Sequence, residues 1–353
     1  MCGLFGFAGP PSFRAAALLQ ALAIADQVRG EHSTGVAVAA RTEGSRRLFP
    51  RFSKKALSGR EFVRSGWSKI LFREKYPLAI GHNRHATAGK VNDRNAHPFW
   101  IPRPHGGALT AHNGIVGGKE SLAVRFGVRD YPVDSEVYFR AIARRAGHDE
   151  AALLGAIEEV TTFILPRADF ACLWLEPAWR SLYFWRSPGR PLAVFDARSA
   201  ALGRFLASTV AIFSDAWGTI RGCLPSLKSV SWFEARPFTV YRVKDDGRWE
   251  VDPVRKIHVP KDALPERPPA AAPPARQGTL LWPDAAPDPD LPEEEAEGPR
   301  GFTCIACGGT VSEDEAVFAD PETGRRSDTG KPHHADCAPE PPPAAPGGDP
   351  WGR

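Results

Sequence analysis

The chain has 353 residues, 42% of them hydrophobic, and a formal net charge of +4 at pH 7. This size allows one large core and a smaller appended unit, and no run of eighteen apolar residues is present to span a membrane. The first ten residues lack both a basic segment and a long apolar stretch, so we expect no signal peptide. The six cysteines do not form a disulfide framework, which favours a reducing, cytoplasmic location.

Hydrophobic periodicity predicts the order of elements in the first 258 residues. An apolar strand at 2–9 precedes a helix at 12–29, with Ser12 as its N-cap. Further strands are predicted at 36–40, 77–82 and 108–112, helices at 135–146 and 149–162, and strands at 169–175, 182–186, 192–195, 205–208 and 238–243. One block of helices between blocks of strands favours layered α+β packing over alternating βαβ units.

The composition changes beyond residue 258. Residues 259–300 are rich in proline, alanine and acidic side chains, which predicts an extended, disordered linker. Residues 301–338 regain cysteine, histidine and glycine and are predicted to form a small folded unit, followed by a disordered tail at 339–353.

Charge is distributed unevenly between these parts. Residues 259–353 hold 18 acidic and 8 basic side chains, so the part of the chain before them is strongly basic. A basic body is compatible with a nucleic-acid or nucleotide-bearing partner. No motif for binding RNA or DNA accompanies the charge, which favours solubility and association of the body with the tail.

A cysteine directly follows the initiator methionine. Removal of Met1 would leave Cys2 with a free α-amino group, whose pKa of about 8 suits it to accept the thiol proton. Nucleophile and base would then belong to one residue, as in N-terminal hydrolases. Taken alone, Cys2 is better explained as a buried cysteine of a strand.

Six short motifs occur in a fixed order: MCGLFGFAG (1–9), RGEHSTG (29–35), GHNRHATAG (81–89), NAHPF (95–99), HNG (112–114) and DSE (134–136). Together they resemble the class II glutamine amidotransferase domain, the N-terminal-nucleophile glutaminase domain of glutamine phosphoribosylpyrophosphate amidotransferase and glucosamine-6-phosphate synthase. The segments ADFACLWL, YFWRSPGRPL and LASTVAIF extend the resemblance to about residues 2–258. It implies a four-layer αββα sandwich and hydrolysis of glutamine to glutamate and ammonia by Cys2, without a cofactor.

The resemblance also implies roles for single residues. Arg84 would bind the α-carboxylate of glutamine, and Asp134 would accept from its α-ammonium group. The Asn113 side chain and the Gly114 backbone N–H would form the oxyanion hole.

Three further positions match the family. Thr87 and His97 match residues that line the glutamine pocket, and Arg29 matches one that supports the N-terminal strand. Each motif also has an ordinary structural explanation when considered alone, such as a helix N-cap for Asp134 or a turn for Asn113–Gly114.

The chain departs from the family at three places. His32 stands where an acidic residue is common, His85 where an aromatic residue is usual, and Val133 where serine is frequent. The position of His85 is linked to gating of the ammonia channel in the synthase, so the coupling to an acceptor is open.

Residues 259–353 show no synthase-domain signature, so we expect the ammonia acceptor to be either a separate protein or absent, with a separate protein favoured. Two alternatives remain: an N-terminal-nucleophile amidase with another substrate, and a catalytically silent binding module.

The C-terminal unit has the spacing of a metal site. Cys304 and Cys307 form a CxxC motif, and Cys337 closes an HHxxC motif with His334, or less favourably His333, as the imidazole ligand. Three thiolates and one imidazole predict a structural zinc site, and a unit this small needs such support to fold. The alternative is free thiols in a flexible tail.

An apolar segment, Gln277–Trp282, interrupts the predicted linker. The spacing of Gln277, Leu280 and Trp282 is similar to that of short peptides that dock on bacterial sliding clamps. The alternative is that this segment folds back onto the basic domain.

Overall fold

The computed structural model describes residues 2–260, except 42, 43, 46, 105, 221–223, 225 and 226, and five short strands beyond residue 260. The chain divides into two units, Met1–Trp282 and Pro283–Arg353. In the second unit the described strands are β15 (Gly301–Thr303), which pairs with β16 (Thr310–Ser312), and β17 (Val317–Ala319), which pairs with β18 (Lys331–His333).

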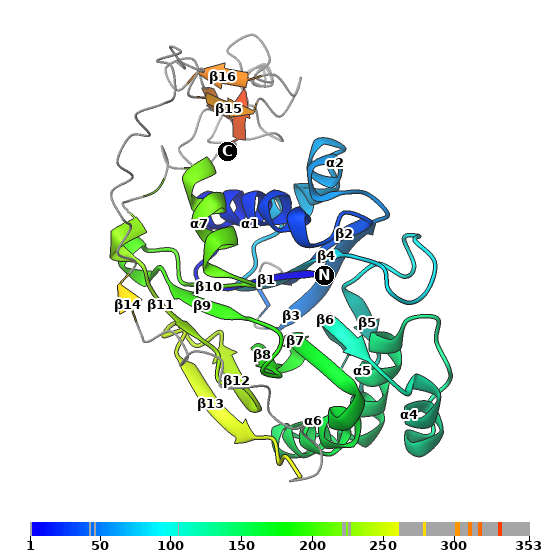
Figure 1. Cartoon of the computed structure of the whole chain (residues 1–353). Coiled ribbons are helices and arrows are strands. Elements are labelled where there is room, and N and C mark those ends of the chain that lie inside the picture. The colour runs from blue at the N-terminus through cyan, green and yellow to red at the C-terminus, as the bar shows by residue number, and fades with distance from the viewer. Residues whose placement is uncertain are drawn as a thin grey trace, which may run out of the picture. The chain divides into compact units, whose positions relative to one another are not determined.

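Two antiparallel sheets form the first unit (Figure 1). One contains β1 (Gly3–Ala8), β2 (Ser33–Arg41), β3 (Leu48–Lys55), β4 (Leu78–Arg84), β9 (Ala193–Asp196), β10 (Arg204–Ala207), β11 (Ser231–Glu234) and β14 (Gly278–Thr279), in the order β14-β11-β9-β10-β1-β4-β2-β3. The other contains β5 (Phe99–Ile101), β6 (Ala108–Val116), β7 (Ala168–Glu176), β8 (Ser181–Arg186), β12 (Thr239–Lys244) and β13 (Val251–Lys256), in the order β13-β12-β8-β7-β6-β5.

Helices cover the outer face of each sheet. The eight-stranded sheet packs against α1 (Phe13–Ala25), α2 (Gly59–Arg64), α3 (Ile70–Arg73) and α7 (Val210–Thr219). The six-stranded sheet packs against α4 (Lys119–Phe126), α5 (Asp134–Arg145) and α6 (Glu150–Ile164). A third apolar cluster, which includes Leu4 and Leu173, fills the space between the sheets. The layers are therefore αββα, as the resemblance implied.

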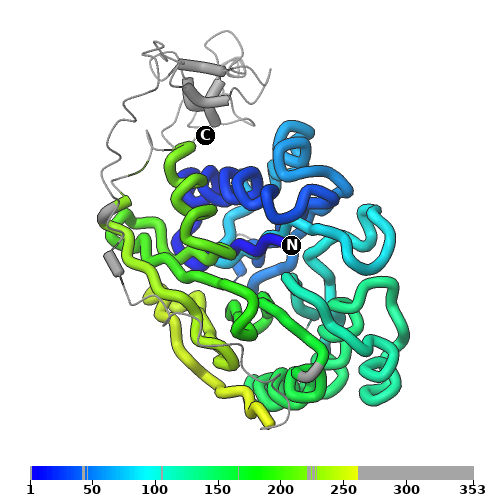
Figure 2. The backbone as a smooth tube through the Cα atoms, in the orientation of Figure 1, coloured from blue at the N-terminus to red at the C-terminus, as the bar shows by residue number. Residues whose placement is uncertain are grey.

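The N-terminal strand lies inside the larger sheet, between β10 and β4, as the trace in Figure 2 shows. All six residues of β1 are buried. Its side chains alternate between the two faces of the sheet, as in any strand. Phe5 and Phe7 contact the helical layer, and Leu4 and Ala8 contact the second sheet. The strand that carries Cys2 is thus held from both faces.

Most predicted elements are present, with shifted ends. Ser12 caps α1 by accepting a hydrogen bond from the Ala15 N–H at 3.1 Å, as predicted. The predicted helix 12–29 is α-helical only to Ala25, and a 3-10 turn at Asp26–Arg29 completes it. Asn113 and Gly114 lie within β6, so the explanation of this pair as a turn is wrong.

No helix among the described residues combines the length and apolarity needed to cross a bilayer. Gly278–Thr279 forms β14, in which Thr279 lies opposite Ser231 and Gly278 opposite Trp232 of β11. This backbone pairing favours the folded-back alternative for segment 277–282, although Gln277, Leu280 and Trp282 lie outside the described residues.

Candidate active site

The thiol of Cys2 lies at the start of β1, beside the segment that follows β4. It donates a hydrogen bond to the carbonyl oxygen of His85 (3.4 Å) and accepts one from the His85 backbone N–H (3.2 Å). Cys2 is only 9% exposed. Burial raises the pKa of the thiol, and the bond from the His85 N–H opposes that rise. The side chain is therefore held in place as a protonated thiol until a base accepts its proton.

Two charged residues lie against this N-terminal strand. Arg29 donates a hydrogen bond from Nε to the carbonyl oxygen of Cys2 at 2.9 Å. Asp26 is fully buried, and a Cβ atom added to Gly3 would lie 2.0 Å from its Oδ2 atom. Neither Asp26 oxygen has a hydrogen-bond partner among the described residues. Burial raises the pKa of this carboxyl well above its ordinary value, while the Arg29 charge lowers it.

Arg84 ends β4, and its guanidinium group is turned into the loop that follows. It donates to the carbonyl oxygens of Ala88, Gly89 (3.5 Å) and Lys90 (3.3 Å). The residue is 2% exposed, and burial lowers the pKa of the guanidinium while Asp134 acts in the opposite direction. The loop and the buried cation therefore order each other, and the cation lies within electrostatic range of Asp134.

Asp134 begins α5 and ties that helix to the end of β6. Its Oδ2 atom accepts from the Val116 N–H and its Oδ1 atom from the Ser135 N–H, both at 2.8 Å. Each carboxylate oxygen keeps a second lone pair for another donor. The pKa of the Cys2 thiol is raised in part by the Asp134 charge, so the carboxylate also lies near the nucleophile.

Asn113 and Gly114 occupy a special position on β6. Asn113 is fully buried, and neither polar atom of its side chain has a hydrogen-bond partner among the described residues. Leaving a buried amide without a hydrogen-bond partner costs about 1–3 kcal/mol. Such an unpartnered group in a folded protein calls for an explanation, and binding of a ligand is one. Gly114 has a φ of +144°, and a Cβ atom there would lie 1.8 Å from the carbonyl oxygen of Asp169. Only glycine fits there.

Three buried histidines lie behind these residues. His82 Nε2 is 2.9 Å from the carbonyl oxygen of His112, and His97 Nε2 is 3.0 Å from Ser135 Oγ. Burial lowers the pKa to about 3 for His82 and to about 4 for His112, and well below its ordinary value for His97. The imidazoles are therefore neutral polar groups at pH 7.

The structure separates the two predicted pocket-lining residues. Thr87 is exposed on the loop after β4, where it is free to meet a ligand. His97 is 3% exposed and its ring lies 4.1 Å from that of His82, so it supports the site from behind. No role was predicted from the sequence for Asp26, His82 or His112. The only sequence signal for Asp26 is an acidic residue at the end of an apolar helix.

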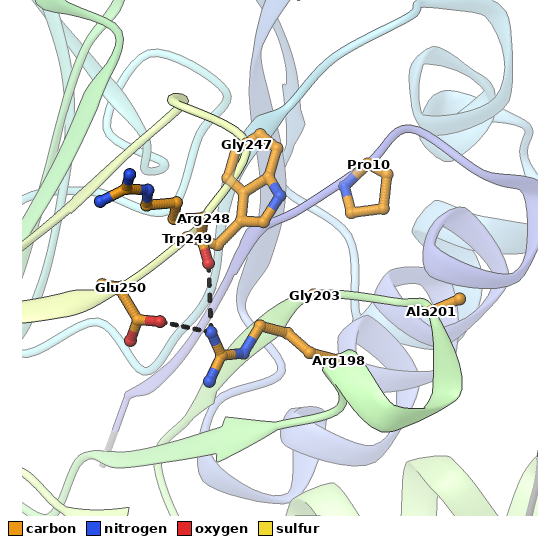
Figure 3. A pocket seen from close by; sticks show the side chains of 8 residues that line it. All are labelled: Pro10, Arg198, Ala201, Gly203, Gly247, Arg248, Trp249 and Glu250. Carbon is orange, nitrogen blue, oxygen red and sulfur yellow. Dashed lines mark hydrogen bonds and ion pairs between the residues drawn. The ribbon is translucent and has the colours of Figure 1, made fainter.

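A concave region of the surface lies away from this site. A pocket of about 380 Å³ is lined by Pro10, Arg198, Ala201, Gly203, Gly247, Arg248, Trp249 and Glu250 (Figure 3). Pro10 follows the end of β1 opposite to Cys2. Arg198 already pairs with Asp196 (2.9 Å) and Glu250 (2.6 Å), so the charge of this residue is compensated within the protein.

The described residues contain no group of three or more His, Cys, Asp or Glu side chains able to hold a metal ion. The predicted zinc ligands Cys304, Cys307, His334 and Cys337 lie outside the described residues. The thiol of Cys2 thus lies within electrostatic range of a buried cation and a carboxylate, and that carboxylate is bonded to β6, the strand that carries the unpartnered amide. This set fits acyl transfer by a thiol nucleophile.

Comparisons with known proteins agree with this arrangement. The chain is 31% identical over 148 residues to an amidophosphoribosyltransferase of Rhizobium etli, covering 40% of this chain and 28% of the relative. It is 36% identical over 118 residues to a glutamine–fructose-6-phosphate aminotransferase (isomerizing) of Aquifex aeolicus, covering 33% of this chain and 17% of the relative. The chain thus spans less than a third of either relative, and no protein-family profile matches it.

Solved structures show the same fold. A glutamine phosphoribosylpyrophosphate amidotransferase of B. subtilis, complexed with ADP and GMP, superposes with a TM-score of 0.54 at 21% identity, over 71% of this chain and 49% of the other. A structure described as the allosteric regulatory enzyme of purine biosynthesis gives 0.52 at 22% identity, over 70% and 48%.

This chain shares the αββα layers of these solved structures, and Cys2 directly precedes a central strand of its larger sheet. Together with the two sequence relatives, this fold supports an N-terminal-nucleophile glutamine amidotransferase domain in this chain.

Proposed function

We propose that this domain hydrolyses the side-chain amide of glutamine, with Cys2 as the nucleophile once Met1 is removed. One observation carries the proposal: the Cys2 thiol is held by the backbone of His85, directly after the buried Arg84 and within electrostatic range of Asp134. A zwitterionic substrate needs both charges, and an amide without them needs neither. This favours glutamine over the alternative of an amidase for another substrate.

The residues have distinct roles in the proposed reaction. The α-amino group of Cys2 accepts the thiol proton, and the thiolate attacks the amide carbon. Asn113 Nδ2 and the Gly114 N–H donate to the oxygen as it becomes negative. The C–N bond then breaks, the proton passes to the nitrogen, and ammonia leaves. Water hydrolyses the thioester to glutamate and restores the thiol.

Both relatives are transferases by name, and both are longer than this chain. We propose that the ammonia made here is consumed by a separate acceptor protein. We also propose a cytoplasmic location, because a reducing compartment keeps Cys2 as a free thiol. Zinc at Cys304, Cys307, His334 and Cys337 and clamp docking through Gln277, Leu280 and Trp282 remain hypotheses.

The test is release of glutamate from glutamine by protein whose intact mass shows that it starts at Cys2. Cys2→Ala should abolish release and keep the wild-type circular dichroism spectrum. Cys172→Ala is the matched control, because it removes a second buried free thiol that lies in the core beside α5. An active Cys2→Ala protein would refute the nucleophile. Retained Met1 together with an inactive wild type would favour the silent binding module.

A further inference from the structure

The segment before β2 packs tightly against the end of β4. The β2–β4 ladder places Ser33 opposite Arg84, and beyond it the His32 N–H donates to the carbonyl oxygen of Arg84 at 3.0 Å. A Cβ atom at Gly30 would lie 2.4 Å from the carbonyl carbon of Arg84 and 2.5 Å from the backbone nitrogen of His85. Residues 30–32 therefore form a rigid support for the backbone that contacts the Cys2 thiol.

The His32 side chain continues this support where the ladder ends. Its Nδ1 atom accepts a hydrogen bond from the Ala86 backbone N–H at 2.9 Å. Its ring also stacks on that of His85, with centroids 4.8 Å apart and an interplanar angle of 24°. His32 thus holds two consecutive residues of the loop that begins at Arg84.

We propose that His32 is a positioning residue for the glutamine site, which acts as a hydrogen-bond acceptor only while its imidazole is neutral. The predicted effect on glutamine binding rests on the proposed function, whereas the contacts of His32 do not depend on that function. Residues 84–86 are fixed on one side by His32 and on the other by the thiol of Cys2. Loss of the acceptor would release the Ala86 backbone. The loop after β4, which carries Thr87 and binds the Arg84 guanidinium through its carbonyl oxygens, would then be held less firmly.

Protonation of His32 has a defined effect on this geometry. A protonated Nδ1 becomes an N–H donor and faces the Ala86 N–H, which is also a donor. The contact then changes from attraction to repulsion. The groups that act electrostatically on the His85 ring are the α-amino terminus, His32 and Glu31. Positive charge on His32 would also oppose charge on His85, so acid should loosen the loop.

Two substitutions of His32 distinguish the effect of its hydrogen-bond acceptor from the effect of its stacking ring. His32→Asn keeps an acceptor near the place of Nδ1 but cannot be protonated. His32→Phe keeps the stacking ring but removes the acceptor. The matched control is His258→Asn, the same change at an exposed histidine after β13. Each protein is assayed for KM and kcat from pH 5 to pH 8, and for the rate at which iodoacetamide alkylates Cys2.

We expect His32→Phe to raise KM for glutamine by roughly fivefold to tenfold at pH 8, the ratio expected for one lost hydrogen bond. Cys2 should also be alkylated several-fold faster, because its partner His85 is less well held. His32→Asn should have a wild-type KM at pH 8 and should lack the rise in KM that is expected of the wild type in acid. The control should resemble the wild type throughout.

Either of two results would overturn the inference. Wild-type behaviour of both variants would mean that His32 positions nothing, and equal loss in both would mean that the acceptor is not what matters. The alkylation rate needs no glutamine. A wild type without glutaminase activity therefore refutes the proposed function alone, whereas equal alkylation of all four proteins refutes the positioning role alone.

Discussion

Replacement of Gly3 by alanine would test how closely β1, the strand that follows Cys2, packs against Asp26. The new Cβ atom would lie 2.0 Å from Oδ2 and 2.2 Å from Cγ of Asp26, far inside van der Waals contact. The buried carboxyl has no adjacent solvent into which it can move. Overpacking of this kind typically costs about 1–3 kcal/mol. A displacement of β1 by about 1 Å would also reduce kcat by roughly 100-fold, because Cys2 would move relative to its substrate.

A double-mutant cycle isolates this contact. Asp26→Ala removes the atoms that the new methyl group meets, so Gly3→Ala should cost little in that background, with a coupling energy of about 0.5–3 kcal/mol. Unfolding in urea gives the free energies, and release of glutamate gives kcat. Gly155→Ala in α6 is the control, because nothing lies within 4 Å of its Cβ position. An equal cost of Gly3→Ala in both backgrounds would refute the proposed clash.

Three further predictions concern charges and metal. Arg84→Ala and Asp134→Ala should each raise KM for glutamine at least about tenfold with a smaller change in kcat, since both anchors bind ground and transition states; unchanged kinetics in both would place the pocket elsewhere. Burial raises the pKa of Asp26, so its stabilising contribution is full in acid and declines as pH rises above about 4. Wild type should therefore lose more stability than Asp26→Asn between pH 5 and pH 8 in urea unfolding, and parallel losses would contradict this. One zinc per chain should co-purify and be absent from Cys304→Ser/Cys307→Ser, as measured by metal analysis; a zinc-free, folded wild type would contradict it.

The local sequence pattern correctly predicted the buried N-terminal strand and the start of the first helix. Residues 2–9 are apolar throughout because β1 is buried on both faces, and Ser12 has the backbone and side chain of an N-cap. The strand β3 was not predicted, because Leu48–Lys55 lies at a sheet edge and has a proline and exposed side chains instead of clear alternation. The short helices α2 and α3 have too few turns to show a period.

The candidate site was predicted only as a set of residues. Cys2, Arg84 and Asp134 were singled out by the motifs, but their proximity comes from the pairing of β1 with β4 and from the bond between Asp134 and the end of β6. The burial of Asp26 under Gly3 was not predictable, because it depends on how the turn after α1 meets β1. Histidines inside motifs gave no sign that packing would keep them neutral.

The neutrality of these histidines limits the choice of base for the Cys2 thiol. Burial raises the pKa of the thiol, so a base must accept its proton before attack. With pKa values lowered to about 3 and about 4, His82 and His112 would hold that proton poorly at pH 7. His97 is shifted in the same direction by the same burial. The Cys2 α-amino group, with an ordinary pKa of about 8, is better matched to the task. Activity should therefore depend on removal of Met1, because an amide nitrogen in its place cannot accept a proton.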